Sequence, residues 1–368
     1  MPSLRRNLAV DAMRGLTLAL MVMVNNPGDY AQVYAQLRHS DWNGFTATDF
    51  VFPFFLLIVG VSVAFSLEHR VPRAKNNREL LLPVFSRTLK LISLGLLDNA
   101  FPYFNLRTWR IPGVLQRIGV VYCLSTLLAW RLRPRTLVWL TVGLLLGYWG
   151  VLVLIPVPGV GQPDLASMTA NLAAWLDQKL MAGHLFIPGE EWDPEGLLST
   201  IPALALTLIG VLTGQRLLGP DSYWRKIRAL WGWAGLLLAA GYVWGLYFPF
   251  NRWLWTSSFM LFVAGAGLFS LGLCMLAAES RWTAWALYPF QVLGANAITV
   301  YLASDVMAKA LYVLPGPGPA SLHQMVYARL TDWLSVGPWT SLAWAVGYTF
   351  IMLGLAWGLH ARRIYIKV

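Results

Sequence analysis

The polar residues between Leu37 and Gly60 are the part of the chain best equipped for chemistry. The segment reads LRHSDWNGFTATDFVFPFFLLIVG and sets His39 and Asp49 directly before or within the start of a long apolar run. Titratable groups at a membrane boundary are costly unless they face protein or water, which favours a function for them. Histidine can transfer a proton near neutral pH, and a neighbouring carboxylate can fix its tautomer. Asp49 is equally suited to cap the helix that follows.

Polar and aromatic residues also gather at the ends of later apolar runs. Asp193 and Glu195 precede the run at 197–214, where acidic groups can attract an amine or complement the start of a helix. Together such residues predict a sugar-binding cup on one face of a bundle, formed by Trp42, Asn43, Asp193, Glu195, Asn251, Trp255 and Asn296.

Two arginines lie inside apolar runs. Arg14 follows Asp11 by three residues, on the same face of a helix, and Arg117 follows Gln116 in the segment RIPGVLQRIG. Arginines within a bundle suit a phosphate-bearing ligand, with Gln116 able to donate and accept beside them. Internal pairing with a carboxylate explains them equally well, so both interpretations stay open.

Asn25 ends the first apolar run, in VMVNNPGDY. Asparagine at this position commonly begins a turn, and the Asn-Pro-Gly sequence that follows is turn-like. Asn25 is nevertheless close enough to the apolar run to direct its amide at a reacting carbonyl.

The sequence contains no metal-binding motif, and Cys123 and Cys274 both lie in apolar runs. We therefore expect no metal cofactor.

The composition identifies the class of protein. Of 368 residues, 57% are hydrophobic and only 12% are charged, against about 25% charged in soluble domains. Membrane-spanning helices need about 20 apolar residues each. The chain has ten apolar runs, at about 8–24, 49–67, 82–97, 114–130, 136–155, 197–214, 229–247, 257–277, 284–303 and 339–359. The predicted fold is an all-α integral membrane bundle of about ten transmembrane helices, formed by residues 1–368 as one domain.

The basic residues predict the orientation of this bundle. One set of connections and flanks holds 19 Lys and Arg residues, and the opposite set holds 7. Since cytoplasmic loops are enriched in Lys and Arg, both termini should be cytoplasmic and the His39 loop should face the exterior or periplasm. The net charge of +11 therefore reflects membrane topology, and we expect no nucleic-acid partner.

Several segments carry a family resemblance. They are DAMRGLTLALMVMVNN, HSDWNGFTATDFVFPFFLLIVG, RIPGVLQRIG, WDPEGLLSTIPAL with IGVLTG, NRWLWTSSF and GANAITVY. In this order, from residue 11 to about 301, they resemble the heparan-α-glucosaminide N-acetyltransferase family of transmembrane acyltransferases. The resemblance implies a compact bacterial member in the inner membrane, without the large N-terminal lysosomal domain of the family.

The resemblance also implies an activity. It implies acetyl transfer from cytosolic acetyl-CoA to an amino sugar or oligosaccharide amine on the far side of the membrane, with His39 as the catalytic histidine and Asn25 as its companion. His39 would take the amine proton, Asn25 would donate to the oxyanion, and Arg14, Arg117 and Gln116 would hold the donor. Direct transfer and an acetyl-histidine intermediate both remain open.

A transporter for amino sugars or related solutes is the alternative function. The same polar cup would serve it, although the sequence shows no paired halves of the kind that many transporters have. The exposed aromatic faces of such a bundle are compatible with lipid contacts and with a homodimer.

Overall fold

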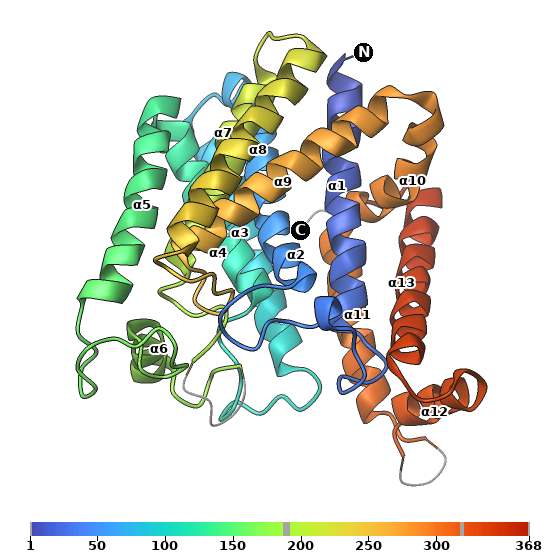
Figure 1. The fold of residues 1–368 in the computed structure, drawn as a ribbon. Coiled ribbons are helices and arrows are strands. Elements are labelled where there is room, and N and C mark those ends of the chain that lie inside the picture. The colour runs from blue at the N-terminus through green and yellow to red at the C-terminus, as the bar shows by residue number, and fades with distance from the viewer. Residues whose placement is uncertain (1, 187–191, 317–319, 367–368) are drawn as a thin grey trace.

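The computed structural model describes residues 2–186, 192–316 and 320–366, and within these ranges the chain forms helices and no β-strand (Figure 1). The α-helices are α1 (Pro2–Asn25), α2 (Val51–Arg70), α3 (Asn77–Ala100), α4 (Val114–Arg131), α5 (Pro134–Leu154), α6 (Leu172–Met181), α7 (Thr200–Leu218), α8 (Tyr223–Gly245), α9 (Ser257–Glu279), α10 (Arg281–Ala295), α11 (Ala297–Val313), α12 (Leu322–Leu334) and α13 (Pro338–Ala361). Short 3₁₀ turns are η1 (Ala35–Leu37), η2 (Ala47–Phe50) and η3 (Val71–Arg73).

The predicted all-helical membrane class is confirmed, and every predicted apolar run falls on helix. Among the described residues, seven helices are long and apolar enough to cross a membrane, or eight if the bent pair α10–α11 is counted as one span. Helices α4 and α8 coincide with the predicted runs at 114–130 and 229–247 but are not among these seven helices. About ten crossings, and cytoplasmic termini, remain predictions.

The run predicted at 284–303 consists of two helices instead of one. Helix α10 ends at Ala295, α11 begins at Ala297, and their axes differ by 75°. Hydropathy does not reveal this break because both halves are apolar. The break leaves Asn296 between two helix ends inside the bundle, where it is 2% exposed.

Glycines let the central helices approach closely. A Cβ atom at Gly60 or at Gly210 would meet the backbone of the facing helix, so α2 and α7 pack in direct backbone contact. Helices α1 and α10 do the same through Gly15 and Gly294. Small residues are typical of such interfaces in membranes. These contacts fix α2, which directly follows the polar segment that contains His39 and Asp49.

The longer loops lie at one end of the bundle (Figure 1). The segment between α1 and α2, which contains His39, lies with α6 and α12 at the end opposite the start of α1 (Figure 1). The polar residues that the sequence places in distant connections can therefore meet there.

Candidate active site

His39 and Asp49 form a directly hydrogen-bonded pair. His39 Nδ1 lies 2.7 Å from Asp49 Oδ1, and the Asp49 side chain is fully buried while that of His39 is 32% exposed. The other carboxylate oxygen, Oδ2, accepts from the backbone N–H groups of Ser40 and Thr46 at 3.2 and 2.8 Å, and from the Thr46 hydroxyl. Asp49 thus completes a capping box with Thr46 at the start of η2 while it holds the histidine. Asp49 therefore holds the histidine as the sequence allowed, but it is the third residue of the capping box and not the N-cap residue that the sequence also offered, because Thr46 takes that position.

This pairing determines which nitrogen of His39 is available. A carboxylate only accepts hydrogen bonds, so Nδ1 must be the protonated nitrogen and the partly exposed Nε2 has a free lone pair in the neutral ring. Burial, followed by the positive charge of Arg252, lowers the pKa of His39, and the hydrogen bond and charge of Asp49 oppose that shift. His39 is therefore neutral near pH 7 and has the form of a general base.

The His39 loop is fastened to the segment before α9. The side-chain amide of Asn251 donates to Asn43 Oδ1 at 3.1 Å, and the Gly44 N–H donates to the Phe250 carbonyl at 2.7 Å. The Trp253 indole donates to the Ser40 carbonyl at 2.8 Å and stands edge-on to His39, with ring centroids 5.7 Å apart. The predicted residues Asn43 and Asn251 are thus brought together beside His39.

Trp42 fastens the loop on its other side. Its indole donates to the Leu165 carbonyl at 2.8 Å, and its ring packs edge-on against Trp192 at 5.6 Å. Trp192 in turn contacts Trp253 at 5.0 Å. A continuous row of indoles therefore flanks the histidine, which suits an aromatic wall for a ligand.

Arg252, which sequence reasoning missed, lies behind the His39–Asp49 pair. Its Nε is 3.9 Å from Asp49 Oδ1, and its guanidinium lies over the Trp253 ring at 4.2 Å. Burial lowers the pKa of Arg252, and the negative charges of Glu195 and Asp49 oppose this. The adjacent sequence NRW gave no signal, because an arginine in a loop between apolar runs is ordinarily a topological charge.

Several buried polar atoms around this pair have no hydrogen-bond partner among the described residues. They are Arg252 Nη1, Ser40 Oγ and the indole nitrogens of Trp192 and Trp255. Most buried polar groups in proteins are satisfied, so a cluster of exceptions points to a bound ligand or water. The donors of this cluster are suited to a carbonyl or hydroxyl oxygen.

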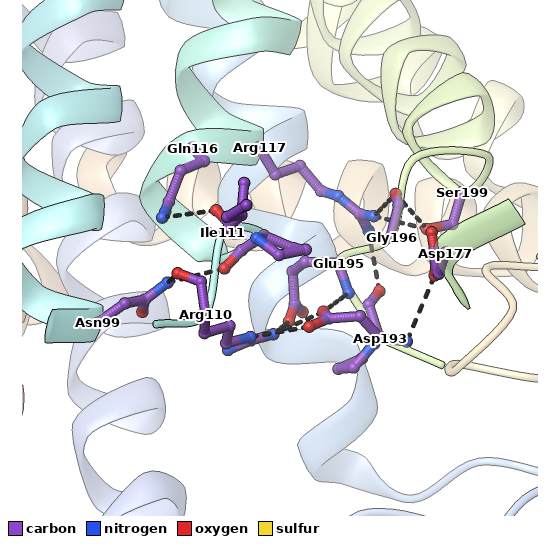
Figure 2. Close-up of polar contacts among 12 residues, drawn as sticks. Asn99, Arg110, Ile111, Gln116, Arg117, Asp177, Asp193, Glu195, Gly196 and Ser199 are labelled. Atoms are coloured by element: carbon purple, nitrogen blue, oxygen red, sulfur yellow. Dashed lines mark hydrogen bonds and ion pairs between the residues drawn. The ribbon is translucent and has the colours of Figure 1, made fainter. Parts of the chain in front are cut away.

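Asp193 and Glu195 are paired with an arginine that the sequence did not single out. Arg110 binds Asp193 through two hydrogen bonds of 2.9 and 2.7 Å and Glu195 through one of 2.6 Å (Figure 2). Burial disfavours the charged form of Arg110, but the two carboxylates have the larger effect and raise the pKa of Arg110. Burial also disfavours the charged form of Glu195, but the surrounding arginines lower the pKa of Glu195. The predicted capture of an amine by these carboxylates must compete with Arg110.

Arg117 and Gln116 lie in the same region, at the start of α4 (Figure 2). Arg117 is 3% exposed and donates to the carbonyls of Pro194 and Gly196 and to the Ser199 hydroxyl, with distances of 2.5–3.2 Å. Gln116 donates to the Ile111 carbonyl at 3.1 Å. Arg117 thus braces the loop before α7 and Gln116 braces the segment before α4, and their predicted contact with the donor stays a prediction.

Trp255 packs against Arg117 and is buried. The Arg117 guanidinium stacks over its ring at 4.7 Å, and Phe52 of α2 packs against it edge-on at 5.4 Å. Its backbone is in the left-handed region, with φ of 54°, which is uncommon for a large side chain and is costly. Trp255 is thus held between α4 and α2.

Arg14 lies away from Arg117, in a cavity of about 470 Å³. It pairs with Asp11 at 2.8 Å, as the sequence allowed, and it also donates to the Ser62 hydroxyl at 2.8 Å. Three further cations line this cavity, at Arg70, Arg87 and Lys90, and sequence reasoning had treated these only as topological charges. The cavity has the charge expected of a site for a polyanion.

Asn296 belongs to this cavity and not to the surroundings of His39. Its side chain holds the C-terminal segment by two hydrogen bonds of 3.0 Å, donating to the Ile364 carbonyl and accepting from the Ile366 N–H. The structure therefore does not join Asn296 to Trp42, Asn43 and Asn251 in one cup. The break between α10 and α11, which the sequence pattern concealed, is the reason.

Asn25 lines a third region, a cavity of about 180 Å³ between the end of α1, α11, α12 and α13. No hydrogen bond links its side chain to His39 in the described part of the chain; its backbone carbonyl accepts from the Tyr30 hydroxyl at 2.7 Å. Across the same ranges, no three His, Cys, Asp or Glu residues are grouped to hold a metal ion.

Comparison with known proteins agrees with the resemblance seen in the segments. A family model described as heparan-alpha-glucosaminide N-acetyltransferase, catalytic, matches residues 6–237. The heparan-alpha-glucosaminide N-acetyltransferase of Mus musculus is 29% identical over 364 residues, covering 83% of this chain and 55% of the relative. The one of Homo sapiens is 30% identical over 356 residues, covering 81% and 52%.

The chain spans about half the length of these relatives. The family match covers more than half of the chain and contains His39, Asp49, Arg110 and Glu195. The chain therefore belongs to the heparan-alpha-glucosaminide N-acetyltransferase family.

Proposed function

We propose that this protein is a transmembrane acetyltransferase that moves an acetyl group from cytosolic acetyl-CoA to the amine of an amino sugar on the outer side of a bacterial inner membrane. Residues 1–368 act in this proposal as one domain. The observation that supports it most is the pair of His39 and Asp49, set among unpartnered buried donors. The names of the relatives supply the acetyl donor class and the glucosamine-type acceptor.

His39 acts as the general base. The acceptor nitrogen attacks the thioester carbonyl carbon, and its proton passes to His39 Nε2 as the new C–N bond forms. The C–S bond then breaks, and the leaving thiolate of CoA takes a proton, so that the base is restored. Asp49 keeps Nδ1 protonated and stabilises the imidazolium that forms. A transient acetyl-histidine would use the same nitrogen as nucleophile.

Arg252 polarises the thioester carbonyl. Its Nη1 is buried and unpartnered, and its Nε lies near Asp49. A donor placed where negative charge develops typically contributes about 3 kcal/mol to lowering the barrier. The sequence assigns this task to the amide of Asn25. Arg252 is the stronger candidate, because its guanidinium is already beside the His39–Asp49 pair.

The Arg14 cavity receives the donor. Its lining follows one face of α2 from Phe55 to Arg70, which at 1.5 Å per residue is about 22 Å along the helix. The Phe55 end is six residues from Asp49, or nearly two helical turns, and the other end of this face carries Arg70. We therefore place the CoA phosphates at Arg70, Arg87 and Lys90, with the pantetheine arm directed along α2 toward His39.

The acceptor enters from the loops at the His39 end. The indoles of Trp42, Trp192 and Trp253 form its aromatic wall, with Asn43 and Asn251 next to them. This arrangement assumes the predicted topology, in which α1 starts in the cytoplasm and the His39 loop is outside.

The test is transfer of labelled acetyl from acetyl-CoA to glucosamine by purified protein in detergent, with His39→Ala beside the wild type. We expect transfer by the wild type that falls by at least about 100-fold in the variant. Transfer that survives the substitution would retain the enzyme and remove His39 as its base. Failure of the wild type both to transfer acetyl and to bind acetyl-CoA would favour the transporter.

A further inference from the structure

The 180 Å³ cavity between the end of α1 and helices α11, α12 and α13 contains polar groups that the acetyl-transfer site does not use. Its lining includes Asn25, Asp305, Tyr312, His323 and Trp344. Of these, only Asn25 was a candidate from the sequence. The cavity lies on the α11 side of α1, whereas His39 contacts the segment before α9.

His323 is the feature that points to a ligand. It is 6% exposed, and both of its ring nitrogens lack a hydrogen-bond partner within the described residues. The imidazole stacks on Tyr312 at 4.2 Å and meets Trp344 edge-on at 4.8 Å. Two unsatisfied buried nitrogens are costly in an otherwise packed aromatic cluster, unless something in the cavity binds them.

The charges around His323 favour a cationic group. Asp305 lines the cavity, and Asp29 is near enough for its charge to oppose the effect of burial on the pKa of His323. Lys309, which also lines the cavity, pairs with Asp305 at 2.7 Å and with Asp98 at 3.2 Å, so within this group two carboxylates face one ammonium. Aromatic faces beside carboxylates stabilise an ammonium group.

The size and remaining lining restrict the ligand further. A volume of about 180 Å³ is below the about 300–1,000 Å³ typical of sites for drug-sized molecules, so one small ring is the limit. The free amide of Asn25 and the His323 ring offer donors and acceptors for hydroxyl groups. Tyr312 and Trp344 supply flat apolar surfaces.

We propose that this cavity is a binding site for a monosaccharide-sized amine with hydroxyl groups, such as glucosamine, separate from the His39 site. The identification of that amine with the acceptor rests on the proposed function; the existence of the site does not. Such a site would collect amino sugar at the outer face beside the reaction centre.

Equilibrium binding of labelled glucosamine to the purified protein tests this directly. We expect saturable binding to the wild type and equal affinity in His39→Ala. His323→Phe keeps the aromatic stacking but removes both nitrogens, so it should weaken binding by about tenfold or more. Asp305→Asn should also weaken binding, because it removes a carboxylate that attracts the ammonium group of the ligand. Glucose in place of glucosamine should bind more weakly as well, because it lacks that ammonium group. His69→Phe is the matched control: His69 lies near the C-terminal end of α2, outside the cavity lining, so this variant should bind as the wild type does.

The outcomes separate this site from the acetyltransferase. Thermal melting of each variant shows whether it folds, and Trp344→Leu replaces His323→Phe if the latter does not. Binding unchanged in both His323→Phe and Trp344→Leu, no saturable binding to the wild type, or binding lost in His39→Ala would each overturn the proposal. Acetyl transfer measured on the same preparations tests the proposed function independently, since His39→Ala should abolish transfer without affecting this binding.

Discussion

Replacing Asp49 with asparagine should remove the base function of His39 while leaving the fold in place. Oδ2 of Asp49 accepts from two backbone N–H groups and one hydroxyl, whereas Oδ1 accepts only from His39, apart from the more distant Arg252. The amide nitrogen of asparagine would therefore avoid the backbone donors and occupy the Oδ1 position. There it donates to Nδ1, which moves the ring hydrogen to Nε2 and removes the free lone pair.

The expected effect follows from this change of tautomer. General bases contribute about 10²–10⁴-fold, and reversing a catalytic tautomer has cost about 10⁴-fold in serine proteases. We expect kcat to fall by about 10³- to 10⁴-fold, which is about 4–5.5 kcal/mol of barrier at 1.36 kcal/mol per factor of ten. The melting temperature should change little, because the hydrogen bonds at the Oδ2 position remain.

The assay is steady-state acetyl transfer at saturating acetyl-CoA and glucosamine, which gives kcat. Asp41→Asn is the matched control on the same loop: its side chain is 88% exposed and lies 3.7 Å from Arg38 only, so kcat should be unchanged. A kcat for Asp49→Asn close to that of the wild type, in folded protein, would refute the assignment of His39 as a base positioned by Asp49.

Four further outcomes are expected. Wild-type activity should be lost as the pH falls through the pKa of His39, because the protonated ring cannot accept a proton. Burial lowers this pKa from its ordinary value of 6.5, and a pH–rate profile checks the prediction. Arg110→Leu should lower stability by about 3–5 kcal/mol, because Asp193 and Glu195 stay buried and unpaired; chemical denaturation measures it. Gly210→Val should abolish the folded yield in size-exclusion chromatography, because α2 leaves no room for a Cβ. Lys90→Gln should raise KM for acetyl-CoA about tenfold at constant kcat, and an unchanged KM would remove Lys90 from the donor site.

Local sequence determined the elements and the first pair of the site. The apolar runs predicted the helices because a segment that crosses lipid must be apolar and must satisfy its own backbone hydrogen bonds. His39 and Asp49 are ten residues apart and directly precede α2, so their proximity was within reach of sequence reasoning. Asp11 and Arg14 share a helical face and pair as the spacing allowed.

Tertiary structure decided the partners that lie far apart in the chain. Arg110 meets Asp193 and Glu195 across more than 80 residues, and Arg252 reaches Asp49 across about 200. Asn296 was predicted beside the acceptor, but the bend between α10 and α11 places it at the cationic cavity. No local sequence pattern predicts these contacts, because whether two distant polar groups meet depends on which helices pack together. That choice is set by close glycine contacts, such as those of Gly60 and Gly210, which hydropathy does not record.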